Sequence, residues 1–290
     1  MLFPPDFLTR LEYLSIVSKR VFRGSLLAQR RTMQPGSGIE FSAHQEYSPG
    51  DDLRYLDWNV YARHGDMLLK RFQEEQDLHV YFLLDCSRSM DFGKPTKFDL
   101  ARQLVAALAY IALADLDRVS VLTFSNDVVN EFPLTRGKER IVPLMRFLEA
   151  QQLTRSNTDL SRSVRGVLHR TRKVGIAIVV SDLFDESGFQ NGLDQLRYRR
   201  FDGHAVQLHA PEEADPAVLG DVELFDVEND SLRKVTVTER NARTYRKLFD
   251  DYQCSVRDYC RDYNWGCTQS PATVKFDDLV LRMMQESRSA

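Results

Sequence analysis

Two strongly apolar runs stand out along the chain, and each has the length of a strand. Val80–Leu84 and Val174–Val180 consist almost entirely of aliphatic and aromatic residues, and polar residues follow both runs. A short run that is apolar at successive positions is typical of a strand buried on both faces of a sheet. We therefore expect both segments to be central strands.

Amphipathic segments separate these runs from further strand patterns. Residues 98–116 carry leucine, valine and isoleucine at helical spacing, and Val119–Phe124 follows as a strand. Strands that alternate with helices of this length form right-handed βαβ units. The expected fold is an α/β domain with a doubly wound, mostly parallel sheet of Rossmann type. The other expected helices are 137–149, 160–172, 188–197, 239–263 and 276–284, the other strands are 39–42, 67–72, 128–132, 204–208 and 265–268, and a β-hairpin insertion spans 222–228 and 234–238.

The amino-terminal part is expected to be an addition to this domain. Phe7–Arg31 has the pattern of a basic amphipathic helix, and Gln34–Gly38 marks a break. We expect residues 1–75 to form a helical and β elaboration packed on a main domain of residues 76–290. The basic helix suits either docking to an acidic partner or membrane face, or packing on its own domain with a solvated basic side.

The charge balance argues against nucleic acid as a partner. The 290 residues include 39 Lys or Arg and 42 Asp or Glu, a net charge of −3, so no global field attracts a polyanion. The basic clusters Arg197–Arg200 and His169–Lys173 fall at expected helix ends, where cations suit the helix dipole. Peripheral membrane association through the basic arm stays open, without support from composition.

The expected location is the cytoplasm. Met1–Asp6 lacks the basic start and apolar core of a signal peptide, and no apolar run approaches the roughly 20 residues of a membrane span. Four cysteines without C-x-x-C spacing are too few for a secreted disulfide scaffold. The six histidines are scattered and form no H-E-x-x-H pattern, so zinc has little support.

Oxygen-bearing side chains follow the first apolar run directly. Asp85, Ser87 and Ser89 alternate after the strand, so a loop there can turn all three toward one point. Hydroxyl and carboxylate oxygens are ligands of hard cations such as Mg²⁺. Serine and aspartate also favour turns and caps, so a purely structural role for the triplet stays open. Cys86 between them is expected in the core rather than as a nucleophile.

Two later residues extend this pattern. Thr158 comes just before an expected helix, and Asp182 comes just after the second apolar run. Ligands of open α/β sheets bind outside the carboxyl ends of the strands. We therefore expect one metal site along this rim, formed by Asp85, Ser87, Ser89, Thr158 and Asp182.

The order Asp85-x-Ser87-x-Ser89, then Thr158, then Asp182 resembles the metal-ion-dependent adhesion site of the von Willebrand factor A family. The resemblance implies a von Willebrand A-like domain whose serines and threonine bind Mg²⁺ or Mn²⁺ directly or through water. The aspartates of that family act largely through water. One coordination position is left for an acidic side chain of a partner protein.

The sequence departs from that family at two points. Its members usually have glycine before the threonine and after the last aspartate, where Asn157 and Leu183 stand. Thr154 competes with Thr158 for the role of the threonine ligand. Arg88 and the neighbouring loops are expected to shape partner specificity.

An earlier polar stretch contains a second motif. Its residues are Glu46, Tyr47, Gly50, Asp51, Asp52, Arg54, Asp57, Trp58 and Arg63. This motif resembles that of a bacterial family, the domain of unknown function 58, and the likeness runs from about Gly38 to the terminal helix. The resemblance implies a partnership with a MoxR-type AAA+ ATPase in chaperone-like assembly.

The same stretch has a structural reading. Arg54 and Arg63 alternate with Asp52 and Asp57, which predicts paired charges beside anchored aromatic residues of the same stretch, among which is Trp58. In this purely structural role, the side chains would hold the segment against the sheet.

The function that fits best is a non-enzymatic adaptor that holds a partner's carboxylate on a divalent metal. The alternative is a Mg²⁺-dependent phosphohydrolase with Asp85 as nucleophile. Haloacid-dehalogenase-like enzymes place an aspartate at such a strand end, but they need a second aspartate two residues on. This chain has Ser87 there.

Overall fold

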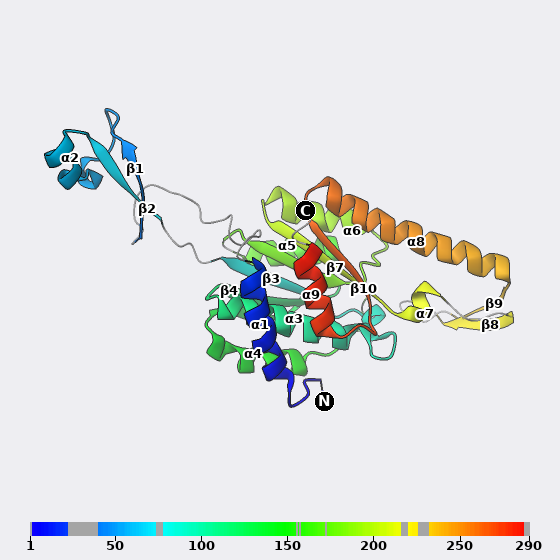
Figure 1. Ribbon diagram of the computed structural model, residues 1–290. Coiled ribbons are helices and arrows are strands. Elements are labelled where there is room, and N and C mark those ends of the chain that lie inside the picture. Colours follow the sequence, from blue (N-terminus) through cyan, green and yellow to red (C-terminus); the bar gives the residue numbers. More distant parts are fainter. Residues whose placement is uncertain are drawn as a thin grey trace. The chain divides into compact units, whose positions relative to one another are not determined.

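The chain divides into two compact units, which are described separately. The computed structural model describes residues 2–22, 40–73, 78–154, 156, 158–171, 173–215, 220–225 and 232–286 (Figure 1). One unit comprises Met1–Arg20 and Leu78–Ala290, and the other comprises Val21–Asp77. The division differs from the expected boundary after residue 75, because the amino-terminal helix belongs with the larger unit.

The larger unit is built around a six-stranded sheet. The strand order is β10-β7-β6-β3-β4-β5, and every neighbouring pair is parallel except β4 with β5. The predicted α/β fold with a mostly parallel sheet is therefore confirmed at this level. The strands are β3 (His79–Asp85), β4 (Arg118–Phe124), β5 (Val128–Arg136), β6 (Ile176–Ser181), β7 (Asp202–His209) and β10 (Gly266–Pro271).

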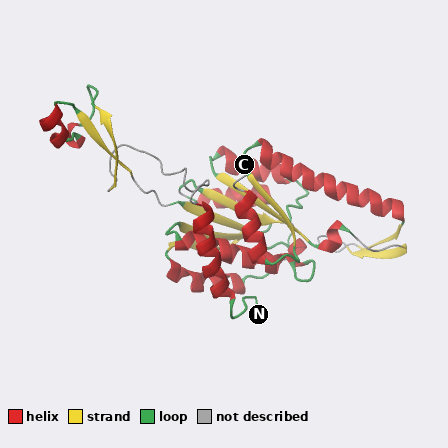
Figure 2. Cartoon of the chain, viewed as in Figure 1, coloured by secondary structure: helices red, strands yellow, loops and turns green. Residues whose placement is uncertain are grey.

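Helices cover both faces of this sheet (Figure 2). On one face α3 packs against the central strands and against α4 and α9. Helix α1 joins them because the ring of Phe7 contacts that of Phe276 in a tilted arrangement, with ring centroids 4.7 Å apart. The other face carries α5, α6 and α8. The helices are α1 (Phe7–Phe22), α3 (Lys97–Ala114), α4 (Ile141–Ala150), α5 (Leu160–Arg170), α6 (Phe189–Tyr198), α8 (Glu239–Asp262) and α9 (Phe276–Glu286).

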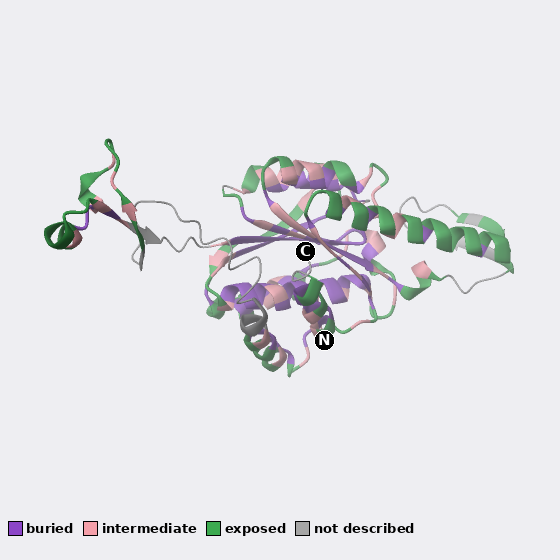
Figure 3. Cartoon of the chain, turned by 45° about the horizontal axis from the view of Figure 1, so that its top comes forward, coloured by how far each residue is buried: buried purple, intermediate pink, exposed green. Residues whose placement is uncertain are grey.

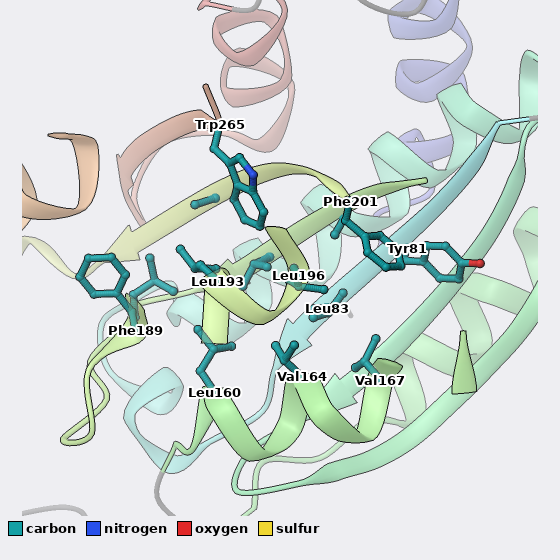
Figure 4. Close-up of a cluster of buried hydrophobic side chains, with 14 of the residues drawn as sticks. Tyr81, Leu83, Leu160, Val164, Val167, Phe189, Leu193, Leu196, Phe201 and Trp265 are labelled. Carbon is teal, nitrogen blue, oxygen red and sulfur yellow. The ribbon is translucent and has the colours of Figure 1, made fainter. Parts of the chain in front are cut away.

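The central strand β3 is buried along its whole length, as its apolar run predicts. Successive side chains point to opposite faces of the sheet. Tyr81 and Leu83 therefore join the core under α5, α6 and α8 (Figure 4), while Phe82 faces the α3 layer. The buried strands lie between two helical layers whose outer surfaces are exposed (Figure 3).

Element boundaries agree with the periodicity to within a few residues, with two clear differences. β5 is an antiparallel edge strand of nine residues, longer than the expected 128–132. The segment after β7, for which no helix or strand was expected, contains a short helix, α7 (Pro211–Ala214). The hairpin strands are β8 (Gly220–Phe225) and β9 (Leu232–Val237), and the turn that joins them lies outside the described residues.

The smaller unit consists of an antiparallel pair and short helices. Strand β1 (Glu40–Glu46) pairs with β2 (Leu68–Gln73), and helix α2 (Trp58–His64) lies between them in sequence. A single 3-10 turn at Leu53–Tyr55 precedes α2. The pattern gave no sign of α2, because its seven residues are too few to show helical periodicity. The expected break at Gln34–Gly38 lies outside the described residues.

The packing of β7 against β10 yields a test of the core. A Cβ atom on Gly203 would lie 2.0 Å from the indole ring of Trp265, so the strand needs glycine there. We expect Gly203→Ala to lower the free energy of unfolding by about 1–3 kcal/mol, measured by urea denaturation. In a Trp265→Ala background the same change should cost much less. An equal loss in both backgrounds would show that the indole contact is not the cause.

Candidate functional site

Two aspartates meet at the carboxyl edge of the sheet. Asp85 ends β3, and Asp182 directly follows β6, its parallel neighbour. Both carboxylates are completely buried. Strand pairing therefore brings together two residues that are far apart in the sequence.

The loop after β3 folds around Asp85. The backbone N–H of Ser87 donates to Asp85 Oδ1 at 2.8 Å, and Ser181 Oγ donates to Asp85 Oδ2 at 2.5 Å. The hydroxyls of Ser87 and Ser89 lie 3.0 Å apart. Asp85, Ser87 and Ser89 thus form one cluster of oxygen atoms, as their spacing predicts. The hydrogen bond from the Ser87 N–H is also what a purely structural turn would form.

Burial and charge act together on Asp85. Loss of solvent is the largest effect, and the nearby charge of Asp182 adds to it, so the pKa of Asp85 is raised from 3.8 to about 7. Two carboxylates in a site without solvent repel each other. A cation is the natural counterpart of such a pair.

The two candidate threonines have different environments. Thr154 Oγ1 donates to the carbonyl of Cys86 at 3.2 Å and accepts from Ser156 Oγ at 3.0 Å. The Thr154 N–H also donates to that carbonyl at 2.8 Å, so this segment lies against the Asp85 loop. By contrast, Thr158 Oγ1 is buried and has no hydrogen-bond partner among the described residues. Thr158 therefore has the hydroxyl with ligand capacity to spare.

The helix start beside Thr158 is capped by its neighbour. Asp159 accepts from the backbone N–H of Arg162 at 2.7 Å, so Asp159 is the N-cap of α5. A buried hydroxyl without a partner is energetically costly. Capping of α5 therefore does not use the hydroxyl of Thr158, which stays available as a ligand.

The donor set suits a hard cation. Two carboxylates and three hydroxyls at one strand edge are oxygen ligands of the kind that Mg²⁺ and Mn²⁺ accept. Among the residues that the structure describes, no group of three or more His, Cys, Asp or Glu side chains is placed to hold a metal ion, at this rim or elsewhere, so the hydroxyls would have to supply the remaining ligands. The residues present therefore fit the expected ion.

A buried lysine also contacts the site, and the sequence analysis missed it. Lys97 Nζ lies 2.8 Å from Asp182 Oδ2 and 2.6 Å from Glu213 Oε1. Burial acts to lower the pKa of Lys97, but the charges of Asp182 and Glu213 outweigh it and raise that pKa above the usual value. The sequence did contain one indication of this ion pair. Lys97 is the first residue of α3, and the helix dipole disfavours a cation at that position unless anions lie nearby.

Two other residues of the β3 loop have distinct positions. Arg88 lies partly exposed in the 3-10 turn Arg88–Asp91, at the mouth of the loop. Cys86 is buried, and its thiol donates to the carbonyl of Phe124 at 3.0 Å. Burial and the charge of Asp85 raise the pKa of Cys86 to about 12, which agrees with a core thiol rather than a nucleophile.

The motif of residues 46–63 lies in the smaller unit. Asp57 caps α2 through the N–H of Asn59 and accepts from His44 at 2.9 Å, with Lys70 at 3.4 Å. The hydrogen bond from His44 is the largest cause that lowers the pKa of Asp57, to about 2. The basic partners of Asp57 are thus His44 and Lys70, neither of which the expected set of paired charges included.

The rest of that motif forms turns and one exposed aromatic surface. Asp52 pairs with Arg54 at 2.6 Å, as expected, and Asp51 accepts from the N–H of Ser48 at 2.9 Å. Trp58 is 62% exposed, so the expected anchored aromatic residue faces solvent in the described unit. The other motif residues, Glu46, Tyr47, Gly50 and Arg63, belong to the same strand, turns and helix.

No helix within the described ranges is long and apolar enough to cross a bilayer.

Comparison with known proteins gives relatives without an assigned function. The family described as "Protein of unknown function DUF58" matches residues 43–254. Uncharacterized proteins of Mycobacterium bovis and Mycobacterium tuberculosis are 24% identical over 237 residues, which cover 80% of this chain and 74% of each relative.

Solved structures show more distant similarity. A conserved hypothetical protein, BatB from Bacteroides thetaiotaomicron, has a TM-score of 0.46 and 15% identity, over 73% of this chain and 100% of that chain. An aerotolerance-related membrane protein from Bacteroides fragilis has a TM-score of 0.48 and 15% identity, with the same coverage. Similarity at this level carries no argument about function, so the site rests on this chain's own residues.

The raised pKa of Asp85 predicts a pH dependence of stability. From about pH 4 to about pH 7 the metal-free native state holds a proton that the unfolded chain has released, so the free energy of unfolding falls as pH rises. The slope is about 1.4 kcal/mol per unit at most. We expect Asp85→Asn to abolish this fall in denaturation measured in EDTA, because asparagine does not titrate.

The control for this measurement is Asp258→Asn on the exposed side of α8. Its stability should keep the pH profile of the wild type. Parallel profiles for Asp85→Asn and the wild type would contradict the assignment.

Proposed function

The chain belongs to the family described as protein of unknown function DUF58, and from its strand-end site we propose that it is a non-enzymatic adaptor that binds a partner's acidic side chain through a divalent cation. The relatives reported above are uncharacterized, so the proposal depends on this chain's own geometry. The observation that carries it is the buried, unpartnered hydroxyl of Thr158 beside the rim where Asp85 and Asp182 meet.

In this proposal the fold is von Willebrand A-like and the ion is Mg²⁺ or Mn²⁺. The hydroxyls of Ser87, Ser89 and Thr158 would hold the ion, and Asp85 and Asp182 would act mainly through water. The bound ion would supply a Lewis-acidic position for a carboxylate. The strand-end position, the Ser87–Ser89 contact and the buried carboxylate pair support this assignment.

The proposed partner is a MoxR-type AAA+ ATPase, in chaperone-like assembly in the cytoplasm. This part rests on the family resemblance of the motif at residues 46–63. An acidic side chain of the partner would complete the coordination of the ion. Arg88, partly exposed at the mouth of the loop, is placed to select among acidic segments.

The alternative as a phosphohydrolase gains no support from the geometry. Both oxygens of Asp85 accept short hydrogen bonds, and burial raises its pKa. A nucleophilic carboxylate must be ionised and reach its substrate. We therefore do not propose hydrolysis.

Metal binding distinguishes the two threonines. We expect saturable Mn²⁺ binding by water-proton relaxation in the wild type, its loss in Asp85→Ala, and at least tenfold weaker binding in Thr158→Val, because valine keeps the shape but removes the ligand. The matched control is Thr154→Val, which should bind Mn²⁺ as the wild type does. The reverse order of the two valine variants would move the ligand to Thr154.

Partner binding depends on the same ion. We expect a purified MoxR-type ATPase from the same genome to bind in Mg²⁺ and to dissociate in EDTA, measured by calorimetry. Arg88→Ala should weaken this binding about tenfold while Mn²⁺ affinity stays unchanged, because Arg88 contacts the partner rather than the ion. Undiminished binding in EDTA would contradict a metal-bridged contact.

A further inference from the structure

The buried ammonium of Lys97 joins three elements at the candidate site. It comes from the start of α3, contacts Asp182 at the end of β6, and contacts Glu213 in α7. The side chains of Lys97 and Asp182 are completely buried, and that of Glu213 is 18% exposed. One cation is thus shared between a proposed metal-site residue and a helix outside the sheet.

Such a cluster is not an efficient source of stability. Desolvation of buried charges offsets most of their attraction, and apolar residues of similar size often stabilise a fold equally well. Its more specific effect is positional, because a buried ion pair tolerates only arrangements that keep its partners together. The cluster therefore fixes where α7 lies relative to Asp182.

Glu213 joins α7 to Lys97 through one carboxylate oxygen and caps the start of α7 itself through the other. Oε1 accepts from Lys97, and Oε2 accepts from the backbone N–H of Ala210 at 2.7 Å. A Cβ atom on Gly93 would lie 3.1 Å from the Ala210 Cβ, so the loop that precedes α3 packs closely against the start of α7. Movement of α7 would therefore change the contact between Glu213 and Lys97.

The same short helix leads to the β8–β9 hairpin and the start of α8 (Figure 1). Asp215 at the end of α7 pairs with Arg246 of α8. Asn241 near the start of α8 donates to the carbonyl of Thr236 at the end of β9 at 3.3 Å. Contacts therefore run from Asp182 through α7 to the base of the hairpin.

We infer that Lys97 and Glu213 are positioning residues that couple α7 and the β8–β9 hairpin to the metal site. The inference rests on the proposed metal site. With α7 in place, Glu213 shares the charge of Lys97. With α7 displaced, Lys97 loses Glu213 and keeps Asp182 as its one anionic partner in this cluster. Lys97 then competes with the metal for the carboxylate of Asp182, so the affinity for the metal falls. Because such coupling is reciprocal, a protein that holds the hairpin in place strengthens metal binding, and metal binding stabilises the hairpin.

The first measurement is Mn²⁺ affinity in Glu213→Gln. Glutamine keeps the size and an acceptor for Lys97 but removes the charge, and we expect about fivefold weaker Mn²⁺ binding, at the low end of typical coupling. The control is Glu212→Gln, the same change of charge at an exposed neighbouring position of α7 that takes no part in this series of contacts. It should bind Mn²⁺ as the wild type does.

A double variant separates charge competition from structural damage. In Lys97→Gln with Glu213→Gln the competing cation is gone, so Mn²⁺ affinity should recover to at least that of the wild type. A double variant that binds as weakly as Glu213→Gln, or more weakly, would overturn the inference. Thermal unfolding in EDTA confirms that each variant is folded, and if the double variant is not, hydrogen exchange decides the question.

Hydrogen exchange gives that independent readout. In the wild type Mn²⁺ should slow amide exchange in residues 211–215 and 232–237, and in Glu213→Gln it should not. Metal binding that is lost in Asp85→Ala but leaves exchange unchanged would overturn the coupling and leave the proposed function standing. Absence of saturable Mn²⁺ binding in the wild type would overturn both.

Discussion

The candidate site depends on two carboxylates that are buried together at one edge of the sheet. Asp85 and Asp182 meet because β3 and β6 are parallel neighbours and both end at the same edge. Two such groups without solvent need hydrogen-bond donors or cations nearby. The donors from Ser87 and Ser181, and the ammonium of Lys97, are all placed to meet that need.

The hydrogen-bond donors and the ammonium group lie on two different sides of the site. On the side of α7, Lys97 and Glu213 balance Asp182 with charges that the protein itself supplies. On the side of the β3 loop, Asp85 has only neutral donors, and the hydroxyl of Thr158 has no partner within the described residues. In the proposed function a divalent cation on this second side would balance the charge of Asp85 and take the hydroxyl of Thr158 as a ligand.

The hydrophobic periodicity of the sequence was sufficient to predict the sheet, but it was not sufficient to predict all residues of the site. The runs Val80–Leu84 and Val174–Val180 predicted central strands, and the order of strands and helices predicted a parallel sheet with one rim for the oxygen ligands. Glu213 could not be found in this way, because only the tertiary structure brings it to a lysine 116 positions away in the sequence. The choice between the two threonines also required hydrogen bonds, which sequence spacing does not contain.

The most direct test of the metal site is anomalous diffraction from crystals grown with Mn²⁺. The account predicts one strong peak at the carboxyl edge of the sheet, with oxygens of Ser87, Ser89 and Thr158 about 2.1 Å away or joined through a water, the distance typical of small divalent cations. The Ser87–Ser89 hydrogen bond should give way to metal contacts. No peak at this rim, with that hydrogen bond intact and Thr158 still unpartnered, would contradict the account.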